Sequence, residues 1–129
     1  MTYVIDTHPL IWLVEDNARL SKKAKAVLTD PSSPIVVSTI VLVEVRYLYS
    51  ARRINITLDE LYQRILDSIN CTIYPVNEEV VQHIPESLNI HDAIITATAL
   101  VYRDVLGQQV KLITKDQKIQ ASKLVDVLW

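Results

Sequence analysis

The stretch from Tyr3 to Pro9 limits the possible fold more than any other part of the chain. It is typical of a short apolar strand that runs directly into a carboxylate, Asp6, and then turns into a helix. Pro9 cannot continue a strand ladder, but it suits the first turn of a helix. In open α/β sheets the ligand crevice lies outside the carboxyl ends of the strands. Asp6 is therefore expected at the ligand-binding edge of a parallel sheet, on a strand in its middle.

Strand-like runs alternate with helix-like segments along the rest of the chain, which predicts an α/β fold with helices on both faces of a parallel sheet. Further strands are expected at Ile35–Val37, Thr72–Tyr74, Val110–Thr114 and Leu124–Leu128. Helices are expected at Pro9–Val14, after the N-cap Ser21, and at Ile40–Ala51, Leu58–Ser68, Val76–Ile84, His91–Arg103 and Gln117–Ser122. The length of 129 residues favours a single domain, residues 1–129.

The composition excludes several classes of protein. The single glycine, Gly107, argues against the glycine-rich loops of Walker and Rossmann nucleotide sites. The single cysteine, Cys71, excludes an internal disulfide and is typical of a reducing compartment, so a cytoplasmic location is expected. One cysteine and three scattered histidines lack the spacing of structural zinc sites. The longest apolar run, Ile35–Val45, is too short to span a bilayer, and the net charge of −2 gives no global basic field.

Four acids are candidates for a functional site, and three of them also have an ordinary structural explanation. Asp6 could cap the first helix, although Thr7 could do the same. Asp116 could cap the short helix after it, while Thr114 places a hydroxyl at the same edge of the sheet. Asp92 falls in the first turn of a long apolar helix, where an acid gains from the helix dipole.

Glu44 is the most informative of these acids, because capping cannot explain a carboxylate in the middle of a helix. A carboxylate is costly to bury unless it is paired or bound to a cation. A buried salt bridge to an arginine elsewhere in the chain is the structural alternative to a functional role. The helical stripe that carries Glu44 is almost wholly apolar and comprises Ile40, Val41, Tyr47, Leu48 and Ala51.

The positions of the acids indicate one shared crevice. Asp6 and Asp116 each follow a strand. Glu44 lies on the helix after another strand, and Asp92 opens a helix. Two carboxylates about 4 Å apart repel by roughly 4 kcal/mol at an effective dielectric of about 20, so without a cation one or more would be protonated at pH 7. A hard divalent ion removes this repulsion, and few protein ligands are typical of Mg²⁺, with Mn²⁺ as the next choice.

Taken together, these motifs resemble the PIN-domain nucleases and, more narrowly, the VapC-type toxins of bacterial toxin–antitoxin pairs. The similarity extends over essentially the whole chain, as far as the terminal VDVLW. Each block is short, but their order and spacing together are specific. The blocks are YVIDTHPLIW with Asp6, VVSTIVLVEV with Glu44, HDAIITATAL with Asp92 and LITKD with Asp116.

The resemblance implies a three-layer α/β/α sandwich and a Mg²⁺- or Mn²⁺-dependent endoribonuclease site. It also implies a homodimer and a small antitoxin protein that blocks the cleft. The family's acids correspond to Asp6, Glu44, Asp92 and Asp116, and the hydroxyl next to the fourth acid corresponds to Thr114. Under this hypothesis Asp6, Asp92 and Asp116 hold the ion, and Glu44 binds it through water or acts as a general base. Cleavage of RNA would leave a 5′-phosphate and a 3′-hydroxyl.

RNA needs positive charge beside an acidic site. Trp12 is expected to pack in the core, and the alternative is a contact with an antitoxin or with the second chain of a dimer. His8 and His91 are interpreted as hydrogen-bonding neighbours of the acids rather than as catalysts. The basic candidates, each of which could equally be ordinary solvated charge, are Lys22, Lys23, Lys25, Arg46, Arg52, Arg53, Lys115 and Lys118.

Two other functional classes remain open from the sequence. A phosphoacceptor receiver-like signalling domain also combines a parallel sheet with acids at strand ends. However, it needs an acid pair after the first strand, where Thr7 follows Asp6, and a phosphoacceptor Asp after a middle strand, where Pro75 stands. The other class is a non-catalytic module that keeps a PIN-like fold and binds RNA or protein, and the presence of all four acids argues against it.

Overall fold

The computed structural model describes residues 1–129 and contains a five-stranded sheet with the order β3-β2-β1-β4-β5. Every neighbouring pair of strands is parallel. The first strand lies in the centre, as the sequence predicts. The strands are β1 (Thr2–Ile5), β2 (Ile35–Ser38), β3 (Cys71–Tyr74), β4 (Val110–Ile113) and β5 (Val127–Leu128).

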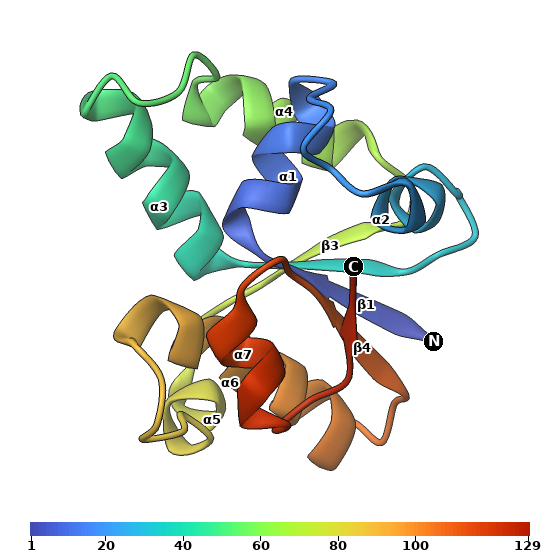
Figure 1. Ribbon diagram of the computed structural model, residues 1–129, viewed down its shortest axis with the longest axis vertical. Helices are drawn as coiled ribbons and strands as arrows, with labels where there is room; N and C mark the ends of the chain where they lie inside the picture. The colour runs from blue at the N-terminus through green and yellow to red at the C-terminus, as the bar shows by residue number, and fades with distance from the viewer.

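Helices cover both faces of this sheet, so the predicted three-layer α/β/α sandwich is confirmed (Figure 1). Four helices lie on one face, and they are α1 (Thr7–Val14), α2 (Lys22–Leu28), α3 (Thr39–Ser50) and α4 (Leu58–Asp67). The other face carries α5 (Glu78–Gln82), α6 (Ile90–Asp104) and α7 (Gln117–Ser122). None of these helices is long and apolar enough to cross a lipid bilayer.

The predicted caps start the helices, because each side-chain oxygen accepts a hydrogen bond from an unpaired N–H of the first turn. Ser21 accepts from the N–H of Ala24 at 3.1 Å, and Thr57 accepts from that of Glu60 at 3.1 Å. Asp6 caps α1, so this helix begins at Thr7, two residues before the predicted start at Pro9.

Two predicted segments are shorter in the structure, the first because of a long-range contact and the second because of a left-handed turn. The segment predicted as a helix at Val76–Ile84 is helical only in α5, because the N–H of Val76 donates to Oγ1 of Thr39 at 2.9 Å. The last strand was expected at Leu124–Leu128. The chain first turns at Lys123, which has a left-handed φ of 55°, and joins the sheet only in β5.

The core contains 26 buried side chains in one cluster, which lies on both faces of the sheet. Every residue of β2 is buried, as expected for a strand covered on both sides. The longest helix, α6, is buried at nine of its positions, including the run from Ala93 to Ala99. The sheet and α6 therefore form a firm support for side chains at the carboxyl edge of the strands.

Candidate active site

The carboxyl ends of β1 and β4 lie side by side because Ile5 is in register with Ile113. The next residues, Asp6 and Thr114, are therefore neighbours, and Oγ1 of Thr114 donates to Oδ2 of Asp6 at 2.7 Å. Oδ1 of Asp6 accepts from the backbone N–H of Thr7 at 2.7 Å. Burial raises the pKa of Asp6, and these two hydrogen bonds lower it. Asp6 thus caps α1 and also faces the candidate site.

Glu44 approaches the same edge from α3, and its side chain is 18% exposed. Oε1 accepts from Oγ1 of Thr7 at 2.9 Å, and Oε2 lies 3.8 Å from Nδ1 of His91. No lysine or arginine pairs with Glu44, and its one charge partner is the ring of His91, which forms an ion pair only when it is protonated. Burial is the largest cause that raises the pKa of Glu44, and the charge of Asp6 adds to it.

The predicted stripe around Glu44 is buried only in part. Val41 and Leu48 are buried, but Tyr47 is 67% exposed and Ala51 is exposed as well. Glu44 therefore lies at the margin of the buried face of α3 rather than in its middle. This position explains how one carboxylate can be largely covered and still face an open edge of the sheet.

Asp116 caps the short helix α7, so the capping role expected for it is confirmed. Its Oδ1 accepts from the N–H groups of Lys118 at 2.8 Å and Ile119 at 3.0 Å. Its own N–H donates to Oγ1 of Thr114 at 3.0 Å, which fixes Asp116 beside Asp6. Both capping bonds use the same oxygen, so Oδ2 of Asp116 makes no hydrogen bond and remains available for a ligand.

Asp92, in the first turn of α6, makes no hydrogen bond or ion pair. Burial is the largest cause that raises its pKa to about 6, and the charges of Asp116, Asp6 and Glu44 follow in that order. The pKa of Asp92 therefore depends on all three other acids. The four predicted acids therefore lie around one place at the carboxyl edge of the sheet, and no lysine or arginine pairs with any of them.

Two threonines connect these acids, Thr114 through its hydroxyl alone and Thr7 through its N–H and its hydroxyl. Thr114 bridges Asp6 and Asp116, and Thr7 bridges Asp6 and Glu44. Both threonines are buried, with 0% and 1% exposure respectively. Thr7 was considered in the sequence only as an alternative cap, so its contact with Glu44 was missed. The signal was a buried mid-helix acid without a predicted partner, which requires a donor from a neighbouring element.

The donor set fits a hard divalent ion held largely through water. All candidate ligands are carboxylate or hydroxyl oxygens, which suit Mg²⁺ and Mn²⁺. No three His, Cys, Asp or Glu side chains come together as a ready-made cage. Mg²⁺ does not need one, because it usually keeps several waters and takes one or two carboxylates. The free oxygens of Asp92 and Asp116 meet that requirement.

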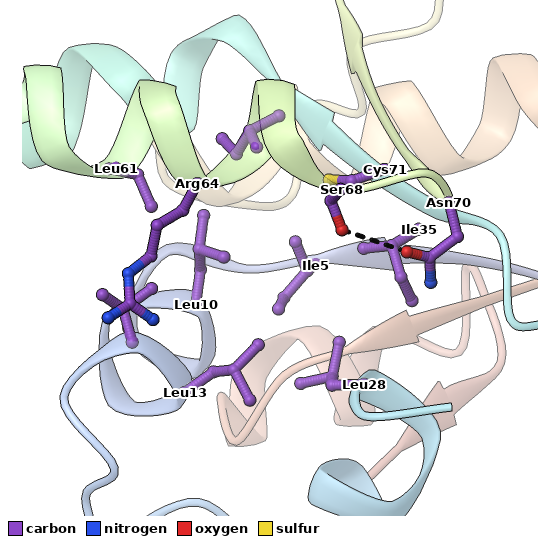
Figure 2. A pocket seen from close by; sticks show the side chains of 12 residues that line it. Ile5, Leu10, Leu13, Leu28, Ile35, Leu61, Arg64, Ser68, Asn70 and Cys71 are labelled. Carbon is purple, nitrogen blue, oxygen red and sulfur yellow. Dashed lines mark hydrogen bonds between the residues drawn. The ribbon is translucent and has the colours of Figure 1, made fainter. Parts of the chain in front are cut away.

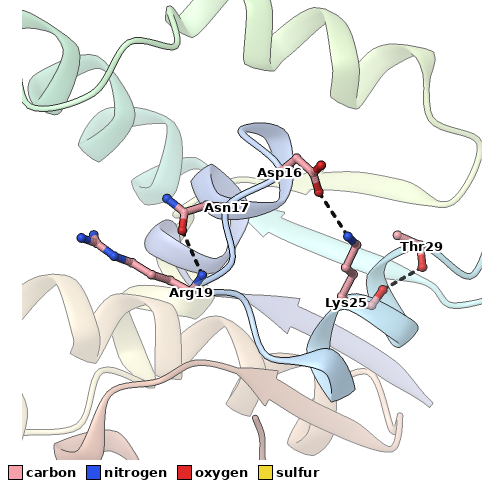
Figure 3. A network of polar contacts seen from close by, with 5 residues as sticks. All are labelled: Asp16, Asn17, Arg19, Lys25 and Thr29. Atoms are coloured by element: carbon pink, nitrogen blue, oxygen red, sulfur yellow. Dashed lines mark hydrogen bonds and ion pairs between the residues drawn. The ribbon is translucent and has the colours of Figure 1, made fainter.

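The basic candidates differ in their position in the fold and in whether they already form an ion pair. Lys115 and Lys118 flank Asp116 in the chain and are exposed. Lys25 is already paired, because its Nζ lies 3.1 Å from Oδ1 of Asp16 (Figure 3). The remaining candidates are also exposed, on α2 and on α3 with the turn after it, and they are Lys22, Lys23, Arg46, Arg52 and Arg53.

The main apolar hollow of the molecule lies away from the acids, between the sheet and helices α1, α2 and α4. It has a volume of about 190 Å³, and Leu10, Leu28 and Leu61 point into it (Figure 2). Arg64 and Asn70 add polar groups to its lining, and none of the four acids contributes to it. This hollow is therefore separate from the candidate active site.

A family model with the description "PIN domain" matches residues 3–123 of the chain. The chain belongs to the PIN-domain family. The predicted resemblance to PIN-domain nucleases is thereby confirmed, and the parallel sheet is that of the family's fold. A search of curated proteins found no match.

Solved structures with the same fold as this PIN-domain chain include toxin–antitoxin complexes. VapBC2 from Rickettsia felis, bound to a promoter DNA fragment, matches with a TM-score of 0.67 and 14% identity, covering 99% of this chain and 98% of that one. A toxin–antitoxin complex from Klebsiella pneumoniae matches with a TM-score of 0.65 and 21% identity over 99% and 97% of the two chains. The PIN domain of RRP44 from T. brucei matches with a TM-score of 0.64 and 14% identity, covering 98% of this chain and 75% of that one.

The sheet order excludes the receiver-domain alternative. Receiver domains have the order 2-1-3-4-5, in which the first strand lies between the second and the third. This PIN-domain chain has the order β3-β2-β1-β4-β5. The acids, the threonine and the lysine of the LITKD block therefore lie on a different framework from the one that the receiver chemistry needs.

Proposed function

We propose that this chain is a divalent-metal-dependent endoribonuclease that acts as the toxin of a toxin–antitoxin pair. The carrying observation is the grouping of the four acids, since Thr114 joins Asp6 to Asp116, Thr7 joins Asp6 to Glu44, and the charges of all three act on Asp92. PIN-family membership supports nuclease chemistry. The solved VapBC complexes with the same fold support the toxin role and an antitoxin partner.

In this proposal Asp6, Asp92 and Asp116 hold Mg²⁺ or Mn²⁺. When bound, such an ion supplies an activated water and offsets the negative charge that builds on the phosphate. Asp92 is the most available ligand, because nothing else occupies its carboxylate. Oδ2 of Asp116 is free, and Thr114 keeps Asp6 and Asp116 at a fixed spacing.

Glu44 is proposed as the general base, or as a ligand through water. Burial raises its pKa above the ordinary value, which is the direction that favours a general base, since a base is most effective when its pKa lies close to the working pH. Thr7 holds Oε1 of Glu44, so Oε2, which lies 3.8 Å from Nδ1 of His91, is the oxygen left to accept a proton from a reacting water. Attack in line with the leaving oxygen would then give a 5′-phosphate and a 3′-hydroxyl.

The proposed substrate is RNA in single-stranded loops, because side chains cannot read the deep major groove of an A-form helix. The proposed assembly is a homodimer of single-domain chains, residues 1–129, that an antitoxin inhibits in the cytoplasm. The exposed lysines that flank Asp116 in the chain, Lys115 and Lys118, are the proposed phosphate contacts.

The test is cleavage of a structured RNA by the purified chain with Mg²⁺ or Mn²⁺, with EDTA, and after the ion is restored. Asp6→Asn should abolish cleavage, whereas Asp67→Asn, at the far end of α4, should not, and circular dichroism should show both variants folded. Cleavage that survives EDTA or Asp6→Asn would refute the proposal. RNA binding without any cleavage would instead indicate the non-catalytic alternative.

A further inference from the structure

Beside the four acids lies a group of aromatic rings that the proposed chemistry does not use. Leu128 of β5 is in register with Ile113 of β4, and Ile113 is in register with Ile5 of β1. The residues that follow these three are Asp6, Thr114 and Trp129. Trp129 therefore lies in the same row at the carboxyl edge of the sheet as the centre of the candidate site.

The rings form a supported platform. Trp12 is only 9% exposed and belongs to the core, which confirms its predicted packing role. Its ring centroid lies 5.9 Å from that of Trp129, with an interplanar angle of 58°, and 5.8 Å from that of His8. Trp129 is partly exposed and His8 is exposed. The buried indole thus fixes two accessible rings next to Asp6.

A lysine completes this group. Nζ of Lys115 lies 5.9 Å from the centroid of the Trp12 ring. Lys115 stands between Thr114 and Asp116 in the chain, yet it makes no ion pair with any of the acids. The attraction of an ammonium group to an indole face holds the charge on the aromatic side. The charge consequently stays out of the acid cluster and is accessible to a phosphate.

We infer that His8, Trp129 and Lys115 form a subsite that binds one unpaired nucleotide of a single-stranded nucleic acid. This inference rests on the proposed nuclease function and names how the strand is held. The base stacks on the exposed face of Trp129 or on His8, and Lys115 binds the adjoining phosphate. Proteins that bind single strands combine these features, aromatic faces for bases and cations along the backbone.

The position of the subsite supports a nucleic acid over a protein partner. His8 is close enough to lower the pKa of both Asp6 and Glu44, and the sheet register places Trp129 in the same row as Asp6, so this group lies beside the acids. A strand held here places the next phosphate towards the acids. Bases inside a duplex are covered by their neighbours, so the subsite selects an unpaired nucleotide.

Binding is measured by fluorescence anisotropy of a short labelled RNA, single-stranded or annealed to its complement, in EDTA. The absence of divalent ions makes the result independent of cleavage. Trp129→Ala should weaken single-strand binding about tenfold, and Trp129→Phe, which keeps a ring, should stay within about threefold of the original. Lys115→Met should weaken binding and lower the slope of log K against log salt concentration by about 1.

The matched control is Lys123→Met, which removes an exposed ammonium at the other end of α7 from Asp116. It should leave the salt slope unchanged. Intrinsic fluorescence gives a second measurement, since Trp12 and Trp129 are the only tryptophans. Single-stranded RNA should quench this emission, and Trp129→Phe should remove most of the quenching.

The outcomes separate this inference from the proposed function. If the original protein cleaves RNA but Trp129→Ala and Lys115→Met bind RNA as tightly as the original does, the subsite is overturned and the nuclease proposal stands. Equal affinity for the duplex, or no quenching by single-stranded RNA, would also overturn it. Stacking and salt effects as expected, without cleavage in Mg²⁺ or Mn²⁺, would support the subsite and refute the nuclease.

Discussion

The hydroxyl of Thr7 donates to Oε1 of Glu44 at 2.9 Å, and this contact joins the first turn of α1 to the middle of α3. It supplies a partly buried carboxylate with a partner that carries no charge. Because Thr7 is neutral, it does not balance the negative charge of Glu44, which only the rings of His91 and His8 offset in part. An arginine in its place would have satisfied Glu44 structurally and removed it from any reaction.

Replacement of Thr7 by valine should reduce the proposed activity without unfolding the chain. The change keeps the shape of the side chain but removes the donor, so Glu44 loses its orientation and its pKa rises further. We expect kcat to fall about tenfold, which corresponds to about 1.4 kcal/mol, with KM little changed. The acid limb of the pH–rate profile should move to higher pH.

Thr7→Ser is the matched control for that variant, because it restores the hydroxyl. It should recover most of kcat and return the acid limb to its original position. A purely structural role would lower the amount of active enzyme without moving the pH profile, and that result would contradict the role given to Thr7.

Thr114→Val should affect both stability and activity, because one hydroxyl serves two acids. Asp6 loses a donor and the N–H of Asp116 loses an acceptor. The loss should be about 1–3 kcal/mol in the free energy of unfolding, measured with urea. Thr98→Val removes another fully buried hydroxyl, which donates to the carbonyl of Ile94, and should leave RNA cleavage intact. Equal loss of cleavage in both variants would argue against a specific role for Thr114.

Asp92 should make the metal-free protein less stable as the pH rises. Its pKa of about 6 in the folded state lies above the ordinary value of about 3.9. Between these pH values Asp92 holds a proton in the folded chain and releases it in the unfolded chain. The contribution of Asp92 to the free energy of unfolding is therefore greatest below about pH 4 and falls as the pH rises through 6. Asp92→Asn should therefore raise the free energy of unfolding at pH 7 by about 1 kcal/mol, after allowance for solvent screening.

This effect corresponds to a Tm higher by about 3–5 °C, measured by thermal unfolding in EDTA. The difference between Asp92→Asn and the original chain should disappear near pH 4. A Tm that falls in the variant at pH 7 would show that Asp92 has a stabilising partner, against the structure.

Thr96 offers a prediction about stability alone. Its hydroxyl is fully buried on α6 and has no hydrogen-bond partner. Thr96→Val has nearly the same shape and removes the unpaired group, so it should raise the free energy of unfolding in urea by about 1 kcal/mol. A loss of stability would mean that the hydroxyl has a partner in solution, such as a water molecule that extends from the acid cluster.

Most of the fold could be predicted from local patterns. The central position of β1 followed from an apolar strand that opens an alternating chain, and Ser21 and Thr57 marked helix starts because capping depends only on neighbouring residues. The start of α5 and the start of β5 could not be found in this way. They depend on the contact between Thr39 and Val76 and on the left-handed turn at Lys123.

The candidate site was predictable to the level of its acids. Asp6 and Asp116 were placed by the ends of strands, which meet at one edge in any parallel sheet. The contact between Thr7 and Glu44 spans 37 positions in the chain and depends on how α1 packs against α3, which no local pattern contains. The exposure of Tyr47 was missed for the same reason, because periodicity gives the direction of a helical face but not its width.

The central claim is that carboxylates from four separate parts of the chain hold one divalent cation. Isothermal titration calorimetry with Mn²⁺ tests it most directly, on the original protein, on Asp6→Asn and Asp92→Asn, and on the control Asp67→Asn. We predict Mn²⁺ binding by the original protein and the control, and strongly weakened binding by the two site variants. No binding by the original protein, or equal affinity in all four proteins, would contradict the account.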